Sequence, residues 1–196
     1  MRRGARGPLL CARSRAGARV RYRFTATDGS ATRWHHVVIA GWQPDGGRLI
    51  GVGAGWADRL APDGVSWLVA GTEVLRVRFA LRLDPRAHVV GFGERFDRLD
   101  QRGQRLDAVV FEQYKGQGQR TYLPMPFAIV TPTPADAGWG FHVRTSRRTW
   151  YDVGATDDDR LVVEVQLDPR DPSLEVALYG GPPLEVARRF GVDVGP

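Results

Sequence analysis

The sequence has very little cysteine and lysine and no long apolar run. Cys11 is the only cysteine among 196 residues, so no disulfide can form within the chain. Lys115 is the only lysine, and all other basic residues apart from histidine are arginines. No apolar run approaches the roughly 20 residues that a membrane-spanning helix requires. The sequence therefore predicts a protein without a membrane-inserted segment.

The amino-terminal stretch lacks the apolar core of a secretory signal. Residues 8–12 (PLLCA) are too few for such a core, and Arg13 interrupts them. We therefore expect an uncleaved, cytoplasmic protein in which residues 1–19 form a basic, disordered tail.

Positive charge is concentrated at the same end of the chain. Eight arginines and no acidic residue lie within the first 27 residues, and the rest of the chain holds 20 basic and 22 acidic residues. The net charge of +6 therefore comes from the amino terminus, while the body is slightly acidic. Because a nucleic-acid-binding domain needs a basic face on its folded part, this pattern argues against nucleic acid as a partner.

The body of the chain is rich in segments whose polarity alternates with period two. In residues 75–83 every odd-numbered residue is apolar, and Arg76, Arg78 and Arg82 occupy even-numbered positions. A helix would spread these arginines around its circumference, whereas a strand places them on one solvent-facing side. With 42% apolar residues the chain can also fill a core.

Short strands recur every 8–12 residues, separated by turns rich in proline, glycine and aspartate. This spacing predicts an all-β fold, an antiparallel sandwich over residues 20–180, in which successive strands form hairpins. The expected strands and turns after residue 126 are strands 127–130, 139–145, 149–153, 161–167 and 174–179, joined by turns at 131–138, 146–148, 154–159 and 168–172.

A short helix is predicted after the last strand. Pro183 suits a first helical turn, Val186 and Phe190 are spaced to share one face, and Gly191 can end the helix. We expect residues 181–196 to form this helix and a linker.

Four motifs follow one another between Val74 and Phe190. The first is GFGERFD at residues 91–97 followed by LDQRG at 99–103. The others are YLPMPF at 122–127, GWGFHV with TSRR at 138–148, and GPPLEVA at 181–187. In this order they resemble the amino-terminal β-sandwich domain of family 31 glycoside hydrolases, which has the galactose mutarotase-like supersandwich fold.

The resemblance implies a non-catalytic domain of a retaining α-glycosidase. Such enzymes use two aspartates, both on a (β/α)8 barrel that needs about 250 residues, and neither aspartate maps onto this chain. The expected partners are that barrel and, through the complete enzyme, an α-linked glycan. We expect no catalytic residue, no cofactor and no hydrolysis by this chain alone.

The polar segment 111–120 is the predicted substrate contact. It combines amides, which both donate and accept hydrogen bonds, with an aromatic ring and the only lysine, a composition suited to sugar hydroxyls. The resemblance places a loop here over the substrate pocket of the barrel. The candidate substrate-binding residues are Glu112, Gln113, Tyr114, Lys115 and Gln117.

The GFGERFD–LDQRG stretch is predicted to shape a corner of the sandwich. Gly91 and Gly93 free the backbone for a bulge or a tight bend. Charged neighbours such as Glu94 and Arg95 need other partners if buried, which predicts a structural ion network. The residues assigned to this motif are Gly91, Gly93, Glu94, Arg95, Asp97, Gln101 and Gly103, and Arg102 is expected to join the network.

Two other functions stay open on the sequence. A free-standing carbohydrate-binding or interaction module would use some of the six tryptophans as a stacking platform, although we expect most of them in the core. A mutarotase-like enzyme would need a His and a Glu as acid and base, and the four histidines match no such motif. No cysteine pair or His-x-x-x-His spacing suggests a metal site.

Overall fold

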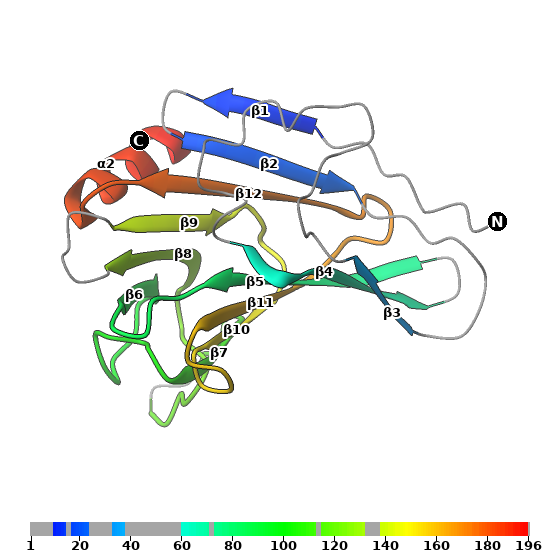
Figure 1. Ribbon diagram of the computed structural model, residues 1–196. Coiled ribbons are helices and arrows are strands. Elements are labelled where there is room, and N and C mark those ends of the chain that lie inside the picture. Colours follow the sequence, from blue (N-terminus) through cyan, green and yellow to red (C-terminus); the bar gives the residue numbers. More distant parts are fainter. Residues whose placement is uncertain are drawn as a thin grey trace.

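The computed structural model of this chain is a sandwich of two six-stranded antiparallel sheets with a helix packed on one of them (Figure 1). It describes residues 10–14, 17–23, 33–37, 60–70, 73–112, 115–131 and 138–195. The predicted all-β sandwich is confirmed. Within this described part, no helix is long and apolar enough to cross a membrane.

Each sheet is assembled from strands that are distant in sequence. The first sheet has the order β1 (Leu10–Ser14), β2 (Gly17–Arg23), β12 (Ser173–Gly180), β9 (Trp139–Val143), β8 (Pro124–Thr131) and β6 (His88–Gly93). The second has the order β3 (Arg33–Val37), β4 (Leu60–Ala70), β5 (Glu73–Arg82), β11 (Arg160–Gln166), β10 (Thr149–Val153) and β7 (Gln104–Ala108).

Part of the expected disordered tail forms strands. Residues 10–14 form β1, and β2 begins at Gly17 and pairs with β12, with Val20 opposite Val176. A strand such as β12 would otherwise leave one row of backbone donors and acceptors unpaired, and β2 satisfies them. The sandwich therefore includes residues before the predicted start at residue 20.

Two of the predicted hairpin turns carry the chain between the sheets instead. The hairpins β8–β9 and β10–β11 are present as expected. However, residues 146–148 lead from β9 in the first sheet to β10 in the second, and residues 168–172 lead from β11 back to β12. The two crossings lie side by side, because Arg147 forms an ion pair with Asp168 and the Gln166 N–H donates to the Arg148 carbonyl at 3.0 Å.

The alternating pattern of β5 is confirmed, with one irregularity. Val77, Phe79 and Leu81 are buried in the core. Near its start the register on β4 shifts, so that Val74, not Leu75, is buried with 2% exposure. One extra residue in a bulge reverses the side-chain alternation, which explains the difference from the sequence pattern.

An aromatic cluster occupies the core beside β6. The ring of Phe92 lies 4.7 Å from that of Tyr151 and 6.2 Å from that of Phe141, measured between ring centres. All three residues are at most 2% exposed. Burial raises the pKa of the Tyr151 hydroxyl, so this residue stays neutral within the core.

The helix α2 (Pro183–Val194) covers the outer face of the first sheet, against β8, β9 and β12 (Figure 1). Val186 is fully buried, and a Cβ at Gly140 would overlap its side chain, so the glycine lets the helix approach the sheet. The helix passes the predicted end at Gly191 and stops at Gly195, which has the left-handed φ of 83°. A glycine weakens a helix but ends it only where the backbone turns left-handed.

Candidate functional site

The GFG segment at the end of β6 turns the chain out of the sheet. Gly91, Phe92 and Gly93 have φ angles of 127°, 66° and 94°, and the register on β8 shifts between the two glycines. A Cβ at Gly93 would overlap the carbonyl oxygen of Leu123 and lie 2.7 Å from the Met125 nitrogen. The predicted bulge is therefore present, and no side chain fits at this glycine.

Beyond the bulge, Arg95 contacts the polar segment 111–120, which we call the amide-rich loop. The side chain of Arg95 is only 5% exposed. The guanidinium donates from Nη2 to the Gly118 carbonyl at 2.9 Å and from Nη1 to the Gln119 carbonyl at 3.3 Å, and Nε lies 3.5 Å from the Asp97 carboxylate. Arg95 therefore holds the loop through its main chain, whatever side chains the loop carries.

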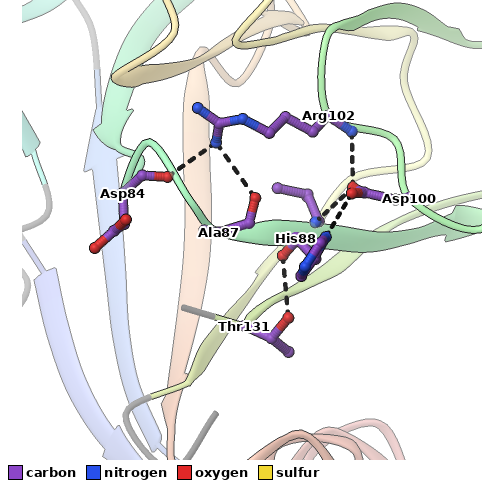
Figure 2. A network of polar contacts seen from close by, with 7 residues as sticks. Asp84, Ala87, His88, Asp100, Arg102 and Thr131 are labelled. Atoms are coloured by element: carbon purple, nitrogen blue, oxygen red, sulfur yellow. Dashed lines mark hydrogen bonds and ion pairs between the residues drawn. The ribbon is translucent and has the colours of Figure 1, made fainter. Parts of the chain in front are cut away.

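The LDQRG motif, which forms the next corner of the chain, is hydrogen-bonded to the start of β6, as Figure 2 shows. One oxygen of the Asp100 carboxylate accepts the N–H groups of Val89 and Arg102, both at 3.0 Å, and the other lies 2.7 Å from Nδ1 of His88. The Gln101 N–H donates to the Val89 carbonyl at 2.8 Å. Backbone groups, more than charges, therefore fix this corner.

The side chains of Gln101 and Arg102 add further hydrogen bonds to carbonyl groups at this corner. Gln101 is 1% exposed and donates from Nε2 to the Arg98 carbonyl at 2.5 Å. The Arg102 guanidinium donates to the carbonyls of Asp84 at 2.9 Å and Ala87 at 3.4 Å, both drawn in Figure 2, and to that of Asp158 at 2.5 Å. At Gly103, φ is 76° and the N–H donates to the Val153 carbonyl at 2.7 Å.

The predicted ion network among Glu94, Arg95, Asp97 and Arg102 is mostly replaced by bonds to carbonyl groups. Of the pairs expected, the described contacts contain only Arg95 with Asp97. Glu94 is exposed, and its main chain makes the contacts: its N–H donates to the Leu123 carbonyl at 3.0 Å, and its carbonyl accepts the Thr121 hydroxyl. A guanidinium has five N–H donors, and tight loops offer many carbonyls close by.

Three of the candidate substrate residues lie on the described part of the amide-rich loop. Glu112 and Lys115 are exposed and Gln117 is half-buried, while Gln113 and Tyr114 lie outside the described residues. The neck of the loop is closed by a bridge between Val110 and Thr121. Three of the five predicted residues therefore lie on a loop whose base is fixed.

Asp107 is the central residue of that base, and the sequence reasoning missed it. Its side chain on β7 is 7% exposed. Its carboxylate accepts Nε and Nη2 of Arg148 at 2.7 and 2.5 Å and Nε of Arg120 at 3.0 Å. Its own N–H donates to the Gln119 carbonyl at 2.9 Å. Asp107 therefore joins the amide-rich loop to the TSRR motif. In the sequence, the only indication of this role is an acidic residue at a strand position that faces away from the core.

A pocket of about 270 Å³ separates the amide-rich loop from the corner that Arg95 and Phe96 form. Its lining from the corner is Arg95, Phe96 and Asp97, and from the loop it is Gly116, Gln117, Gly118 and Arg120. The pocket combines one exposed aromatic ring with backbone and side-chain polar groups, which is a suitable surface for one face of a sugar.

Two carboxylates of this region, the buried Asp107 and the half-buried Asp100, are held in their charged form. Burial alone would raise the pKa of Asp107, but its hydrogen bonds to Arg148 and Arg120 and the charges of both outweigh burial and lower it. For Asp100, burial likewise acts upward, and the Val89 N–H, His88 and the Arg102 N–H bring the pKa below the ordinary value of 3.8. Both groups are therefore ionised at neutral pH.

We expect the stability of the fold to fall in acid. A carboxylate whose folded pKa lies below its unfolded value stabilises the fold above the unfolded pKa, near 3.9, and loses that contribution as pH falls through the folded pKa. Urea unfolding followed by circular dichroism should give similar midpoints at pH 7 and pH 5 and a lower one near pH 3. An unchanged midpoint near pH 3 would contradict the assigned bonds of Asp100 and Asp107.

The described histidines offer no mutarotase-like pair. His88 is exposed and partners an aspartate, and the ring of His142 packs edge-on against that of Phe190, 5.1 Å away. His35 and His36 lie in β3, where the side chains are outside the description. No group of three His, Cys, Asp or Glu residues that could hold a metal is present in the described part.

The tryptophans divide between the core and the outer sheet face. Trp139 is 4% exposed and belongs to the core, and the partly buried Trp67 packs against this core cluster. Trp150 lies on the outer face of the second sheet, with the guanidinium carbons of Arg76 and Arg148 at 4.5 and 5.0 Å from its ring centre. The side chains of Trp34, Trp42 and Trp56 lie outside the described residues.

Comparison with known proteins identifies related sequences. Residues 18–152 match the model of the glycosyl hydrolase 31 N-terminal galactose mutarotase-like domain. The chain is 50% identical over 181 residues to a 1,3-α-isomaltosidase of Kribbella flavida, covering 90% of this chain and 24% of that protein. The family match begins well before Val74, where the resemblance in the motifs starts.

Solved structures agree with this relationship. A cycloalternan-degrading enzyme from Trueperella pyogenes is 42% identical, with a TM-score of 0.67, over 91% of this chain and 26% of that enzyme. The same enzyme in complex with isomaltose is 43% identical, also with a TM-score of 0.67 and the same coverage. This chain thus spans about a quarter of the length of these relatives.

Proposed function

We propose that this chain, which belongs to the glycosyl hydrolase 31 N-terminal galactose mutarotase-like domain family, serves a larger α-glucan-degrading enzyme as a non-catalytic domain. In this proposal it packs against a (β/α)8 catalytic barrel and contributes the amide-rich loop to the substrate pocket. The observation that carries the proposal is the construction of the loop: a base fixed by Arg95 and Asp107 presents exposed polar residues.

An exposed apolar surface around the loop supports packing against another domain. Phe96, Val110 and Leu123 are 74%, 62% and 56% exposed. They come from segments that are joined by hydrogen bonds, since the Glu94 N–H donates to the Leu123 carbonyl and the Phe111 N–H to the Thr121 carbonyl. Clustered apolar side chains on a soluble domain commonly mark an interaction surface.

The relatives support an α-glucan as the substrate of the complete enzyme. Their names specify isomaltosyl and cycloalternan substrates, and one structure holds isomaltose. The exposed Glu112 and Lys115 and the half-buried Gln117 supply the acceptors and donors that sugar hydroxyls need. We therefore assign these three residues, together with Gln113 and Tyr114, as substrate contacts.

A domain exchange tests this function directly. The corresponding quarter of the Kribbella flavida 1,3-α-isomaltosidase would be replaced by this chain. We expect the chimaera to keep kcat/KM within about ten-fold of the parent, because the interface and the loop are related in sequence. The enzyme without any amino-terminal domain should be inactive, and the isolated chain should hydrolyse no α-glycoside.

Loop variants of the chimaera test the contact residues. Lys115→Ala and Gln117→Ala should each lower kcat/KM by about five- to ten-fold, equivalent to about 1–1.4 kcal/mol for one lost hydrogen bond. Gln166→Ala, which removes an exposed amide on β11, is the matched control and should leave kcat/KM unchanged. Equal activity of all three variants, or a chimaera no better than the truncated enzyme, would count against the proposal.

A further inference from the structure

The outer face of the second sheet is hollowed at its centre. The strands β5, β11, β10 and β7 lie side by side, and their register places Ala80, Val162, Asp152 and Arg105 in one row across them. The two small residues of this row are neighbours, and larger side chains surround them. The resulting cavity measures about 590 Å³, which falls within the roughly 300–1,000 Å³ typical of small-molecule sites.

Paired charges form the walls of this hollow. Arg105 lies 3.1 Å from the Asp152 carboxylate, Arg78 lies 2.6 Å from that of Glu164, and Arg160 lies 3.1 Å from that of Asp157. The cavity lining therefore contains as many described cations as carboxylates. Such a site has no net charge to attract an ion, and it offers donors beside acceptors around an apolar floor.

The polar groups of the walls are fixed in place before any ligand binds. The Asp152 carboxylate accepts the Ala155 and Thr156 N–H groups at 2.8 and 3.1 Å. Glu164 also accepts Nη1 of Arg76 at 2.9 Å, and Arg76 in turn covers the ring of Trp150. Side chains already held in one geometry lose little conformational entropy on binding, which favours recognition of a small ligand.

We propose that this hollow is a binding site for a neutral hexopyranose unit of a glycan. Each sugar hydroxyl both donates and accepts, so it can bond to a carboxylate and a guanidinium at the same time. The C–H groups of the ring can lie on Ala80 and Val162. The choice of an α-glucan as ligand rests on the proposed function.

The hollow also adjoins the amide-rich loop. Gln119 lines the hollow, while its neighbours Gly118 and Arg120 line the smaller pocket beside Arg95. The end of the loop therefore stands between the two cavities. A glycan bound in the hollow lies next to the loop that the proposed function assigns to substrate, which makes the hollow a candidate for holding a more distant part of the same chain of sugars.

Titration of this chain with isomaltose, followed by NMR of the backbone amides, tests the site. We expect saturable shifts at Ala80, Val162 and Asp152, with a dissociation constant of about 1–10 mM, the weak range of a single shallow site. Asp152→Asn should weaken binding about ten-fold. Val162→Trp should fill the hollow and abolish the shifts, and Val192→Trp, on the exposed face of α2, is the matched control.

The outcomes separate this site from the proposed function. Shifts confined to residues 115–120 would overturn the hollow as a site and leave the role of the loop standing. Stronger shifts of the hollow residues with inorganic phosphate than with isomaltose would overturn the neutral ligand. Absence of saturable binding by the parent chain, or unchanged binding by folded Val162→Trp, would overturn the proposal, whatever the activity of the chimaera.

Discussion

Gly93→Ala is expected to destabilise this chain by at least about 3 kcal/mol. Two costs add at this position. The φ of 94° lies where a residue with a Cβ is strained by roughly 1–3 kcal/mol. In addition, the new Cβ would overlap the Leu123 carbonyl and crowd the Met125 nitrogen, so the start of β8 would have to move. Urea unfolding of the variant and the parent, followed by tryptophan fluorescence, measures the difference.

Gly103→Ala is the matched control for that variant. Gly103 also has a left-handed φ, 76°, but a Cβ there would meet no atom within 4 Å. It should therefore cost only the backbone strain, about 1–2 kcal/mol. The difference between the two variants isolates the steric cost at the bulge. Equal losses would show that β6 and β8 do not approach each other as closely as described.

Asp107→Asn is expected to cost about 2–3 kcal/mol and to loosen the amide-rich loop. The substitution keeps the shape of the side chain but leaves Arg148 and Arg120 without their shared carboxylate. Removing one partner of a fully buried ion pair costs about 3–5 kcal/mol, and the effect should be smaller here because both arginines remain partly exposed. Urea unfolding gives the free energy of unfolding.

Hydrogen exchange adds a local readout for Asp107→Asn. The N–H of residue 107 bonds to the Gln119 carbonyl, and the Arg120 N–H bonds to the Gln117 carbonyl. Both amides should exchange faster in the variant. Asp168→Asn breaks an exposed pair with Arg147 and should lower the free energy of unfolding much less than Asp107→Asn. A loss no greater than that of this control, with unchanged exchange in the loop, would remove Asp107 from its proposed role as the base of the site.

The two proposed sites lie on different parts of the chain and need different tests. In the proposed function the amide-rich loop and the apolar residues near it contact a catalytic domain, whereas the described residues that line the hollow on the second sheet all belong to this chain. For this reason a binding test of the hollow needs only this chain, whereas a test of the loop needs a catalytic domain.

The sequence by itself determined the local structure and the family. Alternating apolar residues in β5 and β11 predicted strands. Successive side chains of a strand point to opposite faces, so only a strand places all of these apolar residues on one face. The glycines at 91 and 93 predicted a bulge, because only glycine adopts those backbone angles without strain. The four ordered motifs indicated the family of the chain, and the resemblance together with the polar composition of residues 111–120 predicted a substrate-contacting loop.

Only the tertiary structure decided which segments meet. A turn sequence reverses the chain but does not say whether the next strand joins the same sheet. The sequence therefore predicts hairpins at the two places, after β9 and after β11, where the chain crosses between the sheets. The partners of Asp107 are 13 and 41 residues away, and the hollow lies across four strands from different parts of the chain. Such contacts depend on register between distant strands, which is set by packing of the whole sandwich and leaves no local trace in the sequence.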